Sequence, residues 1–169
     1  PAATAAEPAA PASIEVRRDG ETYIVNGLLF APVTRHEAWV VLTDFDHMGR
    51  FVPNLSESRV LRRAGSRLTV FQKGVARFGI LSFPFESVRE VELEAEETVR
   101  SRNISGNLRK LESLTRFSDA DGATRISYRV EIIPDFWLPG FIGEVVIRDE
   151  IEEQFAAILK EMLRRRGAP

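Results

Sequence analysis

The sequence predicts one α+β domain in which a curved antiparallel sheet of about six to seven strands wraps around a long C-terminal helix. Runs of strand-forming residues, separated by short turn signals, fill most of the 169-residue chain. Two short helical segments follow the first of these strands. After residue 140 the apolar residues recur with a helical period up to residue 166. A sheet with one apolar face needs a cover, and this last helix is the only element long enough to provide it.

The first predicted strand covers residues 21–31 and is rich in Tyr, Ile, Val, Leu and Phe. A helix follows it and ends near residue 42. Thr34 is the predicted N-cap of that helix, because Glu37 stands three residues later and completes a capping-box pattern. A second short helix or turn is predicted over residues 44–51.

Six more strand segments are predicted, each bounded by glycine or acidic turn signals. They cover residues 57–63, 67–75, 80–93, 98–104, 108–117 and 124–132. The last of them alternates cleanly. Ile126, Tyr128, Val130 and Ile132 share one face, and charged or hydroxyl residues occupy the other. This alternation predicts one dry face and one wet face.

The segment 80–93 carries a charged residue on its apolar face. Arg89 has the same parity as Phe83, Phe85 and Ser87. A buried arginine must be paired or must face a polar group of a ligand. Arg100 and Arg102 on the next strand share a parity as well and could have the same role. In the alternative interpretation, a one-residue shift near a bulge turns these arginines to solvent, where they pair with Glu86, Glu90 or Glu92.

Composition excludes several classes of function. The chain has no cysteine, so thiol catalysis, disulfides and cysteine-based metal centres are impossible. Its formal net charge of -2 gives no electrostatic reason to expect nucleic acid as a partner. The glycine patterns of phosphate and dinucleotide sites are missing, and so is the Gly-x-Ser-x-Gly motif. No apolar run approaches the roughly 20 residues that a membrane-spanning helix needs.

Histidine is the remaining candidate metal ligand. His47 stands beside Asp44 and Asp46, so a His/Asp metal site is one interpretation. A solvated helix start with favourable acidic residues is the other, and we prefer it. We therefore predict no metal and no cofactor.

The first twelve residues are almost entirely Ala and Pro and predict a leader without a core of its own. The folded domain is predicted to run from residue 13 to residue 169. The leader is typical of a tether left after removal of an export signal, which predicts a periplasmic or secreted protein. An ordinary disordered terminus of a cytoplasmic protein is the alternative.

Several short sequence segments resemble those of a known family. They are residues 38–46 (AWVVLTDFD), 51–55 (FVPNL), 104–109 (ISGNLR), 122–128 (GATRISY) and the Leu138-Pro139 entry to the final helix. Together with the element order, they resemble the START-like (SRPBCC) superfamily, in its polyketide cyclase/dehydrase and coenzyme Q-binding branch. The resemblance implies a helix-grip fold and an internal cavity for a hydrophobic small molecule. It implies no shared catalytic motif, so no catalytic residue is assigned.

We expect the ligand between the sheet and the final helix. The predicted ligand-binding residues are Phe83, Phe85, Ser87, Arg89, Arg100, Tyr128, Trp137, Phe141 and Phe155. Residues 136–142 are predicted to form the mouth of the cavity. They either contact a membrane transiently or pack as core around the start of the helix.

Three functions are compatible with these expectations. The preferred one is binding or transport of a lipid, an isoprenoid quinone or a polyketide-like molecule. A polyketide cyclase or aromatase is the second, with Arg89, Tyr128 and His47 as the residues to test first. The sequence shows no convincing inward-facing titratable group for such chemistry. A protein-interaction module is the third. The sequence does not set the oligomeric state.

Overall fold

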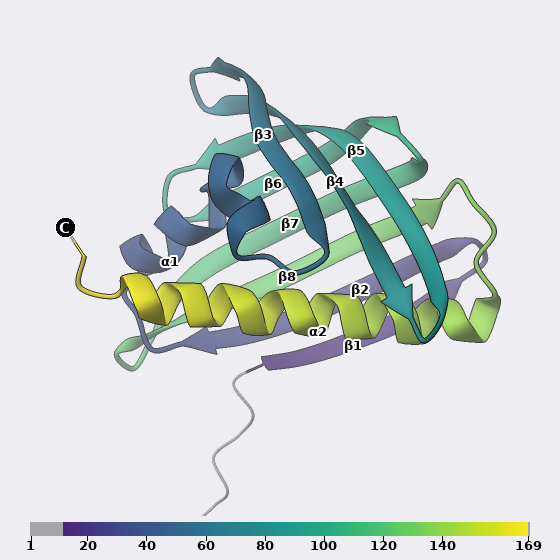
Figure 1. The fold of residues 1–169 in the computed structure, drawn as a ribbon. Helices are drawn as coiled ribbons and strands as arrows, with labels where there is room; N and C mark the ends of the chain where they lie inside the picture. The colour runs from purple at the N-terminus through teal and green to yellow at the C-terminus, as the bar shows by residue number, and fades with distance from the viewer. Residues whose placement is uncertain (1–11, 169) are drawn as a thin grey trace, which may run out of the picture.

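Eight antiparallel strands form one curved sheet, and the C-terminal helix crosses its concave side (Figure 1). The computed structural model describes residues 12–168. The strands are β1 (Ala12–Asp19), β2 (Thr22–Ala31), β3 (Leu55–Ala64), β4 (Arg67–Phe78), β5 (Leu81–Glu94), β6 (Thr98–Gly106), β7 (Leu108–Ala120) and β8 (Ala123–Pro134). The helices are α1 (Arg35–Leu42), the 3-10 helix η1 (Phe45–Arg50) and α2 (Gly140–Arg165). The strand order is β1-β2-β8-β7-β6-β5-β4-β3, so the predicted fold class is confirmed with one more strand than expected.

The additional strand is β1. It pairs with β2 along its whole length, from Ala12 opposite Leu29 to Asp19 opposite Thr22. Ile14 and Val16 are its two large apolar residues, and β1 also packs against α2. So short an alternation gives a weak local signal, and tertiary pairing stabilises the strand instead. The predicted leader lies, apart from Ala12, outside the described residues, so it stays a prediction.

The capping box at the start of α1 is confirmed. The backbone N–H of Glu37 donates to Thr34 Oγ1 at 3.1 Å, and the N–H of Thr34 donates to Glu37 Oε2 at 2.8 Å. The second short helix is the 3-10 helix η1. These two helices close one end of the space between the sheet and α2 (Figure 1).

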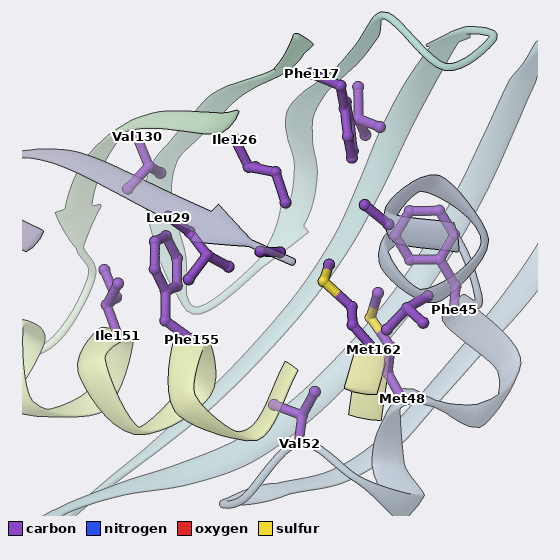
Figure 2. Packing of buried hydrophobic residues seen from close by; sticks show 14 of the residues in the cluster. Leu29, Phe45, Met48, Val52, Phe117, Ile126, Val130, Ile151, Phe155 and Met162 are labelled. Carbon is purple, nitrogen blue, oxygen red and sulfur yellow. The ribbon is translucent and has the colours of Figure 1, made fainter. Parts of the chain in front are cut away.

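The core lies between the concave face of the sheet and α2. Figure 2 shows Leu29, Ile126 and Val130 of the sheet facing Ile151 and Phe155 of α2. The helix comes very close to β2 at Gly27. A Cβ atom at this position would stand only 2.9 Å from a ring carbon of Phe155, so glycine is needed for this approach. In the part of the chain that the structure describes, no helix combines the length and apolarity needed to cross a membrane.

Candidate functional site

A cavity of about 280 Å³ lies between the sheet and α2. Its lining residues on α2 extend from Val146 to Ile158, which corresponds to about 18 Å of helix. Apolar side chains make up most of the wall. They include Leu29, Leu42, Phe45, Met48, Val52, Leu55, Val91, Val99, Leu111, Ile126, Ile132 and Ile151. Such a space suits an apolar molecule oriented by a few polar groups.

The inner face of β5 supplies one wall of this cavity. Phe83, Phe85, Ser87 and Arg89 all line it, as their shared parity predicts. Each is an alternate residue of one strand, so the four side chains project from the same side of the sheet. Of these four predicted ligand contacts, Arg89 is the charged one.

Arg100 does not line the cavity. A bulge lies between Val88 and Arg89, so Arg89 stands opposite Asn103, and Arg102 and Arg100 stand opposite Glu90 and Glu92 on the other face. Arg100 is exposed and stands opposite Glu92. Arg102, also on the outer face, forms an ion pair with Glu90 at 3.7 Å. The solvent interpretation therefore holds for these two arginines and not for Arg89.

The guanidinium of Arg89 is enclosed by protein, and its accessible part faces the cavity. Its Nη2 donates to the neutral acceptor Gln72 Oε1. Its Nε has no hydrogen-bond acceptor among residues 12–168, and no carboxylate of those residues lies within 4.0 Å of the group. Burial lowers the pKa of Arg89, but an arginine stays protonated in proteins. The cavity therefore contains a positive charge that the described residues leave uncompensated.

Tyr128 of β8 and Phe155 of α2 also line the cavity. Their rings meet edge to face, with centroids 5.7 Å apart. Burial raises the pKa of the Tyr128 hydroxyl, and the nearby charge of Arg89 opposes this shift only in part. Tyr128 is therefore a neutral phenol at physiological pH, able to donate a hydrogen bond.

Sequence reasoning missed several polar residues of the cavity wall, and Gln72 and Glu150 are the two that matter most for its chemistry. Gln72 shares the inward parity of Leu68 and Val70 on β4, a signal that was available. Glu150 lies on the apolar stripe of α2, four residues after Val146, where a carboxylate is unusual.

Glu150 is the inward-facing titratable group that the sequence did not reveal. Asn54 Nδ2 donates to its Oε2 at 3.2 Å, and Gln154 Nε2 donates to its Oε1 at 3.3 Å. Partial burial raises the pKa of Glu150, and the neighbouring charge of Glu153 raises it further. The hydrogen bonds from Gln154 and Asn54 lower the pKa and offset part of this rise. A partly buried carboxyl group that lines a cavity is a candidate acid/base group.

Residues 136–142, the predicted mouth, are divided between the cavity wall and the protein surface. Phe136 lines the cavity and stacks on Phe83, with ring centroids 6.3 Å apart. Trp137 and Phe141 point outward instead and are 82% and 80% exposed. The core and surface interpretations therefore apply to different residues of one segment. Trp137 and Phe141 are not part of the wall.

His47 lies outside the cavity. Its Nδ1 is 2.7 Å from Asp44 Oδ1, and the other oxygen of Asp44 accepts a hydrogen bond from Arg165 Nη1 at 2.8 Å. Within residues 12–168 no group of three histidine or acidic side chains could hold a metal ion. His47 therefore cannot act on a molecule in the cavity.

The comparisons with known proteins agree with this geometry. The family model described as "Polyketide cyclase / dehydrase and lipid transport" matches residues 31–159. This match covers more than half of the chain, so the chain belongs to that family. No curated protein matches the sequence.

Solved structures share the fold at low sequence identity. A STAR-related lipid transfer protein from Xanthomonas axonopodis superposes with a TM-score of 0.77 at 12% identity, covering 94% of this chain and 97% of that one. The Zhui aromatase/cyclase from Streptomyces sp. R1128 gives a TM-score of 0.73 at 14% identity, covering 87% and 98%. A START superfamily protein from Mycobacterium smegmatis gives 0.71 at 12% identity, covering 83% and 97%. These neighbours confirm the START-like fold.

Proposed function

We propose that the protein binds a hydrophobic small molecule in the cavity between the sheet and α2. The observation that carries this proposal is the cavity itself, with an apolar wall and a small group of polar side chains. Transfer of apolar surface from water into the cavity contributes about 25 cal/mol per Å² and supplies the driving force. The polar side chains then orient one end of the molecule.

Filling the cavity tests the proposal. Ser113 lines the cavity from β7, whereas Ser127 lies on the outer face of β8. We expect Ser113→Phe to weaken binding of the neutral fluorescent hydrophobe N-phenyl-1-naphthylamine by about tenfold or more, because the new ring occupies its space. Ser127→Phe is the matched control and leaves binding unchanged. Absence of probe binding to the wild-type protein, together with no hydrophobe in native mass spectra of the purified protein, contradicts the proposal.

We also propose that the protein exchanges its ligand at a lipid bilayer, through the end that carries the mouth. Ile80 at the β4–β5 turn is 100% exposed, and Trp137 and Phe141 are nearly as exposed. The contact between Phe83 and Phe136 places these two segments side by side. An exposed cluster of aromatic and aliphatic residues next to an apolar cavity suits the membrane interface.

Liposome sedimentation tests the membrane contact. We expect the double variant Trp137→Ala/Phe141→Ala to lower the partition coefficient onto phosphatidylcholine vesicles by about tenfold, because two large side chains no longer insert. Val40→Ala is the control, since Val40 is 41% exposed on α1 at the opposite end of the molecule. Equal partitioning of both variants and wild type contradicts the contact.

Glu150 favours a second candidate function, the cyclisation of a poly-β-ketone. Its carboxylate would take a proton from a methylene carbon between two carbonyls. The enolate would form a carbon–carbon bond to a second carbonyl of the same chain, and the proton would return to the new alkoxide. Arg89 and Tyr128 would hold the reacting oxygen.

Glu150→Gln tests this chemistry. The variant should bind a synthetic poly-β-ketone as wild type does but form the cyclised product at least about a hundredfold more slowly, as expected for loss of an acid/base group. Wild-type protein that does not accelerate cyclisation leaves binding as the function.

A further inference from the structure

The charge inside the cavity restricts the chemistry of the ligand. Arg89 is the cation of the cavity wall, and its hydrogen-bond partner Gln72 is neutral. A buried ion without a counter-charge is costly, and proteins tolerate it where a ligand supplies the opposite charge. The Nε of Arg89 is buried and has no acceptor among residues 12–168.

The neighbouring groups do not neutralise Arg89. Tyr128 is uncharged because burial raises its pKa. Asn103 stands opposite Arg89 in the sheet, and its Nδ2 donates to the carbonyl of Leu108 at 2.7 Å. Its Oδ1 has no donor in the described chain, but an amide would in any case leave the charge uncompensated.

Glu150 is the carboxylate of the cavity wall, and it lies on α2 rather than on the sheet. Its oxygens accept from Asn54 and Gln154, and it forms no ion pair with Arg89. The outer-face arginines differ, since Arg102 has Glu90 at 3.7 Å. The cavity thus contains one guanidinium with free donor capacity, and no acid of residues 12–168 forms an ion pair with it.

We infer that the ligand is an apolar molecule with a single carboxylate, which pairs with Arg89 on the β5 side of the cavity. This inference rests on the proposed binding function and names its ligand class. A guanidinium presents parallel N–H donors that match the two oxygens of a carboxylate. Because Arg89 has only the neutral Gln72 as a hydrogen-bond partner among residues 12–168, one negative charge on the ligand is enough to pair with it. Tyr128 lies close enough to Arg89 for the two groups to interact electrostatically. Its hydroxyl can donate a further hydrogen bond to the carboxylate of the ligand.

A head-group series tests the inference. Displacement of N-phenyl-1-naphthylamine is measured at pH 8 with decanoate, methyl decanoate and decanol, which share one alkyl chain. We expect decanoate to bind at least about tenfold more tightly than the two neutral probes, because its carboxylate forms charge-assisted hydrogen bonds with Arg89. Arg89→Met should remove this preference and leave the affinity for decanol unchanged or higher.

Two further variants separate charge from folding. Arg100→Met removes an arginine from the outer face of the adjacent strand and should keep the decanoate preference. Arg89→Lys keeps the charge but loses the paired donors, and it should retain part of the preference. If Arg89→Met does not fold, Arg89→Lys and Tyr128→Phe report on the same pairing.

The outcomes are distinguishable. Equal affinity of wild type for decanoate, methyl decanoate and decanol overturns the carboxylate inference and leaves the binding function intact. An equal loss for all three probes in Arg89→Met overturns it as well, because that result indicates a damaged cavity rather than a lost charge pair. Failure of every probe to bind wild type, N-phenyl-1-naphthylamine included, overturns the binding function itself.

Discussion

The two halves of α2 cover the same sheet, but one half packs tightly against it and the other leaves a cavity. Near its C-terminal end, Met162 is completely buried and fills the space beside Phe45 and Met48 (Figure 2). Between Val146 and Ile158 the helix lies over the cavity instead. We call these the packed end and the hollow end of α2.

The sheet under the hollow end explains the difference. Ser87, Ser101, Ser113 and Thr115 point inward there from β5, β6 and β7 and line the cavity. Small side chains at inward positions leave a volume that α2 does not fill, because larger side chains around them keep the helix backbone at a distance from the sheet. The Oγ atoms of Ser101 and Ser113 hydrogen-bond each other at 2.6 Å, so each hydroxyl has one partner within the protein. The packed end of α2 therefore contributes to stability, and the hollow end carries the proposed binding function.

Truncation of Met162 should have the largest effect on stability. We expect Met162→Ala to lower the free energy of unfolding by about 2–5 kcal/mol, since it leaves a void in a filled core. Leu111→Ala at the hollow end should lower the free energy of unfolding by clearly less, because Leu111 already borders a cavity. Urea unfolding of both variants measures the difference. Equal losses would show that the hollow end is as tightly packed as the other.

Loss of the Glu161 carboxylate should have the second largest effect on the free energy of unfolding. Arg164 donates to Glu161 at 2.6 and 2.9 Å, and Arg165 donates at 2.7 Å. These arginines hold the pKa of Glu161 at about 2, below its ordinary value of 4.5. Because Arg164 is largely exposed, we expect Glu161→Gln to cost about 1–3 kcal/mol at pH 7, at the lower end of that range.

The pH dependence of this loss has a definite sign. A carboxyl group whose pKa is lowered by folding stabilises the protein above its unfolded pKa, and that stabilisation disappears as pH falls from 4.5 to about 2. The difference between wild type and Glu161→Gln should therefore be complete at pH 6 and shrink towards pH 2. Glu152→Gln, an exposed change on the same helix, is the control. A difference that does not depend on pH would contradict the assigned role of the two arginines.

Removal of the charge at the hollow end should act in the opposite direction. We expect Arg89→Met to raise the free energy of unfolding by about 1 kcal/mol, because a buried cation without a counter-charge is replaced by an apolar side chain. The gain is limited, since Gln72 loses its donor. Thermal unfolding without added ligand measures it. A large destabilisation would show that Arg89 is structural rather than held for a ligand.

The smallest effect is expected at the mouth. Trp137 is 82% exposed, so Trp137→Ala should change the free energy of unfolding by less than about 0.5 kcal/mol. The same variant should still reduce membrane partitioning. A substantial loss of stability would mean that Trp137 packs more closely than its exposure indicates, and it would remove the basis for the membrane contact.

Local signals predicted most of the fold. Thr34 and Glu37 are three residues apart and form the capping box in the structure. Asp121 and Gly122 both adopt positive φ, as their turn between β7 and β8 requires. The parity of β5 placed Phe83, Phe85, Ser87 and Arg89 on one face. β1 was missed because its stability comes from pairing with β2, not from its own short pattern.

The candidate site was predicted less completely. Tyr128 and Phe155 line the cavity, whereas Arg100, Trp137 and Phe141 do not. Parity within a strand is local, but the alignment of one strand with the next depends on the bulge between Val88 and Arg89. The sequence offered a bulge only as one of two interpretations, and the pairing of β5 with β6 decides between them.

The sequence by itself determined the class of the protein, because the order of strands, turns and helices is encoded in local periods and turn residues. It also determined that Arg89 shares a face with aromatic residues of its own strand. Only the tertiary structure decided that a cavity remains under α2, that Glu150 faces it, and that Arg89 lines it with no carboxylate of residues 12–168 as a partner. These properties depend on how segments that are distant in the sequence pack together. The volume of the cavity and the pairing of its charges involve several segments, so the local pattern of one segment cannot predict them.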